Sequence, residues 1–137
     1  YGYQISLNKN GGSIVNISSD LGIIAPDQRI YEQEGLDKDK QPVKPVSYSV
    51  VKSALLGLSR YVATYWASEN VRSNCLLPGG VQTEQDDVFI NKLTNLIPLK
   101  RMAKNNEYQA AIIFLLSDAS SYMTGTNLIM DGGRSSW

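Results

Sequence analysis

Histidine is absent from this chain of 137 residues, and cysteine occurs only once, as Cys75. Without histidine, the chain supplies no Ser-His-Asp or Cys-His catalytic scheme and no zinc site with histidine ligands, and we expect no metal site. Acid–base chemistry near neutral pH must then fall to tyrosine, lysine, aspartate or glutamate. A single cysteine also excludes a disulfide within the chain. This fits a reducing compartment, so we expect a cytoplasmic protein.

The balance of charges and the length of the apolar runs also limit the kinds of partner that the chain can bind. The 13 basic and 13 acidic residues cancel, which leaves no electrostatic footprint for nucleic acid or a membrane surface. No apolar run approaches the ~20 residues that are needed to span a bilayer. We therefore expect a small-molecule substrate, no nucleic acid and no membrane as partners.

Short β-branched runs alternate with helical patterns along the chain. Strands are predicted at 13–18, 71–77 and 126–130, and helices at 47–68, at 106–116 and, as one or two short pieces, at 84–97. Residues 1–10 are predicted to be the tail of a helix that ends at Asn10-Gly11-Gly12, and the proline-bearing stretch 20–47 to be loop. Strand–helix–strand alternation of this kind predicts an open parallel α/β sheet.

Tyr48 and Lys52 stand four residues apart at the start of the predicted helix 47–68, so they share one face of it. An ammonium near a phenol favours the phenolate and lowers the pKa of the tyrosine, which suits it to general acid–base work. Ser18 and Ser19 follow the strand 13–18, and strand alternation allows only one of them to face a common site. We predict that Ser19 is the one that does.

These motifs occur in an order that resembles the short-chain dehydrogenase/reductase superfamily. A strand ending in Ser-Ser is followed by Tyr-x-x-x-Lys on a helix, by a strand ending in Pro78-Gly79-Gly80, and by a terminal Met130-Asp131-Gly132-Gly133. The resemblance implies a Rossmann-like, doubly wound parallel sheet. Family members are about twice this length and open with a Gly-rich turn for the cofactor's pyrophosphate, and no such turn is found here. We therefore expect residues 1–137 to be the C-terminal portion of one NAD(P)-binding domain, with its N-terminal dinucleotide-binding half absent.

The resemblance also assigns roles to particular residues. It implies that Tyr48 exchanges a proton with the substrate, that Lys52 also binds the nicotinamide ribose, and that Ser19 hydrogen-bonds the substrate oxygen. The Pro-Gly-x-x-x-Thr segment of the family touches the nicotinamide. The cofactor-binding residues implied for NAD or NADP are thus Tyr48, Lys52, Pro78, Gly79, Val81 and Thr83.

One departure bears on the substrate. Ser19 and Tyr48 are 29 positions apart (48 minus 19), roughly twice the spacing of single-domain members. The long connection is similar to that of sugar-nucleotide epimerases and dehydratases, whereas the Asp-Gly-Gly end is not. This combination of a long connection and an Asp-Gly-Gly end resembles sugar-modifying oxidoreductases, including the flagellin-modification group.

Our first hypothesis is an NAD(P)-dependent oxidoreductase that transfers a hydride between nicotinamide and a secondary alcohol or ketone on a sugar or sugar derivative. The alternatives are a sugar-nucleotide epimerase or dehydratase and a non-catalytic nucleotide-binding module. The helix 47–68 carries a broad apolar surface at positions that include Val51, Leu58 and Trp66. This surface exceeds what one sheet face covers, so we expect a homodimer or homotetramer.

Overall fold

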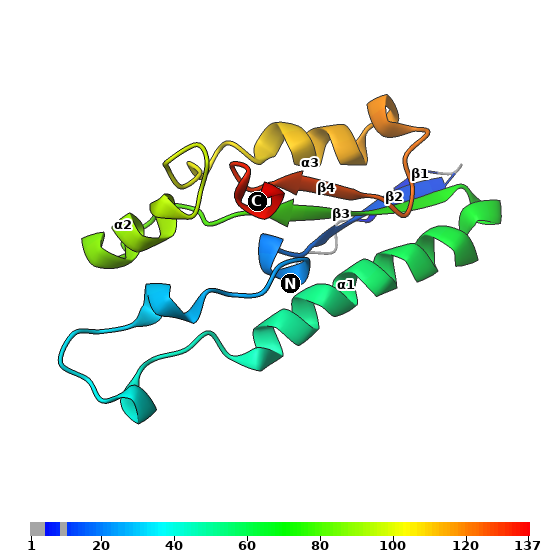
Figure 1. The fold of residues 1–137 in the computed structure, drawn as a ribbon. Coiled ribbons are helices and arrows are strands. Elements are labelled where there is room, and N and C mark those ends of the chain that lie inside the picture. The colour runs from blue at the N-terminus through cyan, green and yellow to red at the C-terminus, as the bar shows by residue number, and fades with distance from the viewer. Residues whose placement is uncertain (1–4, 9–10) are drawn as a thin grey trace.

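The computed structural model describes residues 5–8 and 11–137, which form one four-stranded sheet with helices on its faces (Figure 1). The strands lie in the order β1 (Ile5–Asn8), β2 (Gly11–Ile17), β3 (Val71–Pro78) and β4 (Asn127–Met130). Strands β2, β3 and β4 run parallel, and β1 pairs antiparallel with β2. Because the three parallel strands end at the same edge, the segments that follow them are brought together there.

Two helices cover the opposite faces of this sheet (Figure 1). Helix α1 (Val46–Tyr65) lies on one face and α3 (Gln109–Leu116) on the other. Beneath α3 the core consists of Val15, Leu76, Ala111 and Leu115, and beneath α1 it consists of Leu56, Cys75 and Leu77. The predicted α/β fold with a parallel, doubly wound sheet is confirmed.

Strand β3 shows why a buried strand could be predicted from the sequence. Its residues 73–77 are all buried, since helices lie on both faces of the sheet. A strand buried on both faces does not alternate, and in β3 the apolar run Cys75-Leu76-Leu77 before Pro78 marked it, while Ser73 and Asn74 are buried polar residues. Beyond it, α2 spans Asp87–Asn95, within the stretch predicted to hold short helices.

The prediction for residues 1–10 was wrong where the structure describes them. Residues 5–8 are strand β1 rather than the tail of a helix, and residues 1–4 and 9–10 lie outside the described part. Pairing along β1 satisfies backbone groups at the edge of β2, which a helix tail would leave unpaired. Gly11, with φ of 122°, adopts a conformation that few other residues reach, and it begins β2 instead of ending a helix.

Helix α1 meets the sheet along a narrow stripe and leaves much of its apolar surface exposed. Its fully buried residues are Leu56, Ser59 and Ala63, whereas Val51 and Leu58 are exposed. The helix is apolar on so many positions that spacing alone did not identify the inward face. The loop predicted at 20–47 contains three single-turn 3-10 helices, η1 (Asp20–Gly22), η2 (Gln28–Tyr31) and η3 (Lys38–Lys40). No helix within residues 5–8 and 11–137 is both long and apolar enough to cross a bilayer.

Candidate functional site

Ser19 lies just beyond the end of β2, where it caps the short helix η1. Its Oγ donates a hydrogen bond to Asp20 Oδ1 at 2.8 Å and accepts one from the Leu21 N–H at 3.2 Å. The neighbouring Ser18 donates instead to the carbonyl of Lys52 on α1, at 2.7 Å. The hydroxyl of Ser18 therefore joins the strand to the helix, while Ser19 is held by the turn that follows the strand.

Lys52 is fixed at both its backbone and its ammonium. Its carbonyl accepts from Ser18, and its Nζ donates to the carbonyl of Ile17 at 3.1 Å. The same ammonium lies 5.6 Å from the centroid of the Tyr48 ring. An ammonium has three donors, so two remain for a ligand. The one-turn spacing of Tyr48 and Lys52 thus places the charge beside the phenol, as the sequence predicted.

Gly22 allows the Ser19 turn to lie directly against α1. A Cβ at this position would be 2.7 Å from Ser18 Oγ and 3.0 Å from the Lys52 carbonyl oxygen. The Gly22 carbonyl also accepts a hydrogen bond from Ser53 Oγ at 3.0 Å. The absence of a side chain at Gly22 therefore helps to bring the serine turn close to Lys52.

A buried ion pair lies behind Ser19. The Nη1 of Arg134 donates to Asp20 Oδ2 at 3.0 Å, and the two side chains are only 8% and 3% exposed. Asp20 also accepts from Ser19 Oγ and from the Leu21 N–H through its other oxygen. The carboxylate is therefore satisfied on both oxygens, and it connects the serine turn to the 3-10 turn Arg134–Ser136 near the C-terminal end.

The segment after β3 supplies backbone groups to the same edge of the sheet. The Gly79 N–H donates to the Met130 carbonyl, and the Gln82 N–H to the Ala103 carbonyl, each at 2.9 Å. Within the described residues, the Val81 N–H donates no hydrogen bond, whereas its carbonyl accepts from Gln85 Nε2. An amide N–H without a partner at the end of a parallel strand can donate to a ligand there.

These segments enclose a cleft of about 190 Å³. Of the residues predicted to form the site, Ser19, Tyr48, Pro78, Gly79 and Val81 line it. Lys52 does not line it and approaches from beside Tyr48. Thr83 lies on an exposed turn outside the lining, where its N–H donates to Gln85 Oε1 at 2.7 Å. The structure therefore brings five of the seven residues to one cleft and places Lys52 next to it, and the role of Thr83 stays a prediction.

The long connection between Ser19 and Tyr48 forms one wall of this cleft. Ile30, Tyr31 and Lys44 line it, and burial raises the pKa of the Tyr31 phenol. Asp27 and Arg29 of the same connection pair with each other at 2.6 Å. The Arg29 guanidinium holds the pKa of Asp27 at about 2.

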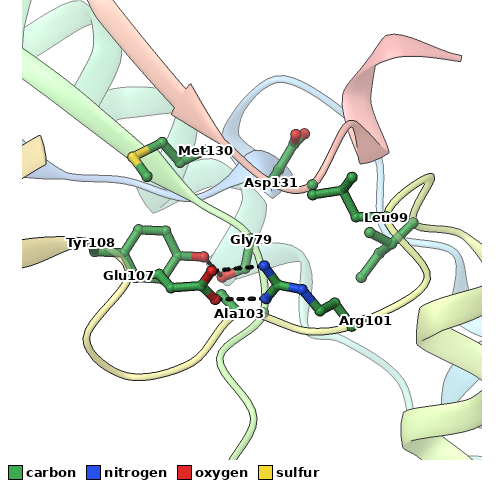
Figure 2. A pocket seen from close by; sticks show the side chains of 11 residues that line it. Gly79, Leu99, Arg101, Ala103, Glu107, Tyr108, Met130 and Asp131 are labelled. Carbon is green, nitrogen blue, oxygen red and sulfur yellow. Dashed lines mark hydrogen bonds and ion pairs between the residues drawn. The ribbon is translucent and has the colours of Figure 1, made fainter.

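A second cavity of about 170 Å³ lies on the other side of the Gly79-Gly80 segment, which lines both cavities. Figure 2 shows Arg101, Glu107 and Tyr108 gathered beneath the strand end that carries Met130 and Asp131. Arg101 and Glu107 form a two-bond ion pair at 2.6 and 2.7 Å, which holds the pKa of Glu107 at about 2.

The Tyr108 hydroxyl donates to the Gly79 carbonyl at 3.2 Å, and burial raises the pKa of this phenol. The polar groups of the second cavity are thus paired with each other, and they support the strand end from behind.

Sequence reasoning missed Gly22, the Asp20–Arg134 pair and the position of Lys44. Asp20 and Arg134 are 114 positions apart, so no local spacing announces their contact. The only indication of this contact in the sequence was an acidic residue directly after the two serines. Lys44 was placed in a loop whose path the sequence did not define.

Comparisons with known proteins agree with the geometry. The sequence profile of the family described as Enoyl-(Acyl carrier protein) reductase matches residues 39–135. D-arabinitol 2-dehydrogenase [ribulose-forming] of Candida tropicalis is 36% identical over 138 residues, which cover 95% of this chain and 44% of that protein. Post-translational flagellin modification protein A of Campylobacter coli is 31% identical over 122 residues, which cover 89% of this chain and 45% of the relative.

Solved structures agree as well. A short-chain dehydrogenase from Leptospira borgpetersenii with bound NAD+ superposes with a TM-score of 0.78 at 32% identity, over 88% of this chain and 43% of that one. A gluconate 5-dehydrogenase from Burkholderia cenocepacia, in complex with NADP and tartrate, gives 0.77 at 27% identity, over 94% and 47%. The chain spans about half the length of the curated relatives that it matches.

Proposed function

Because this chain belongs to the short-chain dehydrogenase/reductase superfamily, we propose that it carries the proton-transfer site of an NAD(P)-dependent oxidoreductase. The reaction is hydride transfer between nicotinamide and a secondary alcohol or ketone. The observation that supports this most is the single cleft shared by Ser19, Tyr48 and the strand end at 78–81, with Lys52 beside Tyr48. We also propose that residues 1–137 are the C-terminal portion of one such domain, with the dinucleotide-binding half elsewhere in the complete protein.

In the direction of alcohol oxidation, the oxygen of Tyr48 removes the hydroxyl proton of the substrate as the carbon gives up its hydride. In ketone reduction Tyr48 returns that proton. A nicotinamide supplies the hydride acceptor or donor when it is bound. The ammonium of Lys52 lies beside the Tyr48 ring, and the Ser19 hydroxyl holds the substrate oxygen in place. The proton thus moves at the Tyr48 oxygen, while Ser19 orients the substrate oxygen and Lys52 supplies a positive charge beside Tyr48.

The same residues fit the nicotinamide end of a dinucleotide. Lys52 has two donors left for ribose hydroxyls, and the Val81 N–H is available to a carboxamide. Pro78 and Gly79 end the strand, so that backbone rather than a side chain faces the ligand. Thr83 is proposed as an additional contact through its hydroxyl from the adjacent turn.

A sugar or polyol is the substrate class that we propose. Two of the similar proteins act, by their names, on arabinitol and gluconate. An epimerase or dehydratase that acts on a sugar nucleotide is the second candidate, because the long connection 20–47 reaches the cleft through Ile30, Tyr31 and Lys44. A non-catalytic binding module remains as the third candidate, and only turnover separates it from the others.

We propose further that the complete protein is a homodimer or homotetramer. Helix α1 exposes Val46, Val50 and Tyr61 at 79%, 61% and 60%, together with Tyr65 at 63%. Large apolar side chains in a row on one helix are typical of an interface. Sedimentation of the complete protein tests this: a monomer at micromolar concentration contradicts it.

Transfer of deuterium tests the proposed reaction. A polyol deuterated at its secondary carbinol carbons is incubated with the complete protein and NAD+ or NADP+, and the nicotinamide is analysed by mass spectrometry. We expect stoichiometric label in the reduced cofactor. A parallel incubation with a sugar nucleotide tests the second candidate: an epimerised or dehydrated product without net cofactor reduction indicates an epimerase or dehydratase. No product from either substrate contradicts catalysis and favours the binding module.

A further inference from the structure

Lys44 places an ammonium in the cleft, next to the group proposed to move the proton. Its Nζ lies 4.1 Å from the centroid of the Tyr48 ring, closer than the ammonium of Lys52. Lys44 is half-buried and lines the cleft together with Ser19 and Tyr48. A substrate whose hydroxyl reaches Tyr48 therefore comes within a few bonds of this second ammonium.

The backbone at Lys44 is fixed rather than free to swing away. Gln28 Oε1 accepts from the Lys44 N–H at 2.8 Å, and Gln28 Nε2 donates to the Lys44 carbonyl at 3.2 Å. This reciprocal pair joins η2 to the residue just before Pro45, where α1 begins. Gln28 thus uses both of its polar groups to fix the backbone from which the Lys44 side chain enters the cleft.

The charge of Lys44 has no counterpart in the cleft wall. The charged residues that line the cleft are Asp20, Lys44 and Arg134. Asp20 and Arg134 neutralise each other in a buried pair. Among the residues that the structure describes, Lys44 forms no ion pair. One positive charge therefore remains uncompensated beside the proposed reaction centre.

We propose that Lys44 binds an anionic group of the substrate, either a carboxylate or a phosphate ester, so that the enzyme acts on acidic sugars rather than on neutral polyols. This inference rests on the proposed function, since it names the substrate class of the same cleft. A charged hydrogen bond of this kind, lost from one partner, weakens binding by about 10- to 100-fold.

The test measures binding and turnover separately in the complete protein saturated with cofactor. Three probes are compared by calorimetry and by initial rates: D-arabinitol, D-gluconate, and a terminal phosphate ester of D-arabinitol. The variants are Lys44→Gln and, as a control, Lys38→Gln, an exposed lysine of the same connection that does not line the cleft. Circular dichroism confirms that both variants are folded.

We expect the unmodified protein to bind an acidic probe more tightly than D-arabinitol. In Lys44→Gln, the Kd and KM for that probe should rise about 10- to 100-fold, while kcat stays within about twofold of the unmodified protein. The binding and turnover of D-arabinitol and the affinity for the cofactor should not change. The Lys38→Gln variant should behave like the unmodified protein on all three probes. The stronger acidic probe, gluconate or the phosphate ester, identifies the anion.

Three results overturn the proposal. The first is equal binding of acidic and neutral probes by the unmodified protein. The second is an equal loss of kcat on all three probes with a displaced pH profile, which assigns Lys44 to Tyr48 itself. The third is weaker cofactor binding in Lys44→Gln, which assigns it to a cofactor phosphate. If an acidic probe binds in a way that depends on Lys44 but is not turned over, this inference is supported and the proposed reaction is contradicted.

Discussion

Replacement of Arg134 by methionine tests whether the ion pair behind Ser19 is buried in solution. Methionine keeps most of the length of the side chain but removes the guanidinium. Asp20, 3% exposed, then keeps its hydrogen bonds from Ser19 and Leu21 but loses the guanidinium that pairs with it, 3.0 Å away. Two charges at that separation attract by about 5 kcal/mol at an effective dielectric constant of ~20. Leaving one charge of a buried pair alone costs about 3–5 kcal/mol in proteins.

The assay is urea unfolding of the complete protein, with Asp20→Asn and the double variant to close a mutant cycle. We expect Arg134→Met to lower the free energy of unfolding by about 3–5 kcal/mol and the double variant to lower it by less, because no charge then stays buried. The exposed pair of Arg29, 80% exposed, and Asp27 provides the matched control, and Arg29→Met should change little. A loss of under about 1 kcal/mol for Arg134→Met, the range of surface pairs, contradicts the buried geometry.

Two further predictions concern the strand end and the second cavity. Gly79→Ala should destabilise the protein by about 1–3 kcal/mol, because the new Cβ would lie 2.9 Å from Asp131 Cα. Gly57→Ala on α1, where a Cβ meets nothing within 4 Å, should instead stabilise it by about 0.5–1 kcal/mol; equal effects in urea unfolding would contradict this contrast. Arg101 holds the pKa of Glu107 at about 2, against an ordinary 4.5, so the stabilisation from this carboxylate is complete above 4.5 and is lost as pH falls towards 2. Denaturant midpoints at pH 6 and pH 3 should therefore differ less in Glu107→Gln than in the parent, and an unchanged difference would show that the pair does not persist in solution.

The elements that the sequence identified are those with a strong local period. Strands β2, β3 and β4 and helices α1 and α3 begin and end within three residues of their predicted bounds, because each reads as one buried run or one helical pattern. Residues 5–8 were misjudged, since their structure depends on pairing with β2 rather than on their own sequence. The face of α1 that meets the sheet was not predicted, because its apolar positions surround most of the helix.

The residues of the candidate site likewise fall into those whose contacts the sequence predicted and those whose contacts it did not. Spacing on one helix predicted the approach of Lys52 to Tyr48, and parallel strand ends predicted that Ser19 and Gly79 would share a cleft. The contacts that no spacing encodes are those made by the connection 20–47 and by the C-terminal turn. Lys44 precedes the helix that carries Tyr48, so helical spacing did not predict its approach, and Gln28 bonds its backbone there. Arg134 reaches Asp20 across the whole fold. Side chains brought together by tertiary structure alone require coordinates.

The turnover of Tyr48→Phe tests the central claim most directly. The change removes only the phenolic oxygen, so packing and the hydrogen bonds of Lys52 should survive. Steady-state rates and a cofactor titration are compared with Tyr122→Phe, a fully exposed tyrosine that does not line the cleft. The account predicts that Tyr48→Phe lowers kcat by about 10²–10⁴-fold with nearly unchanged cofactor affinity, while Tyr122→Phe leaves both unchanged. Near-normal kcat in Tyr48→Phe would remove this residue from the chemistry and contradict the proposed mechanism.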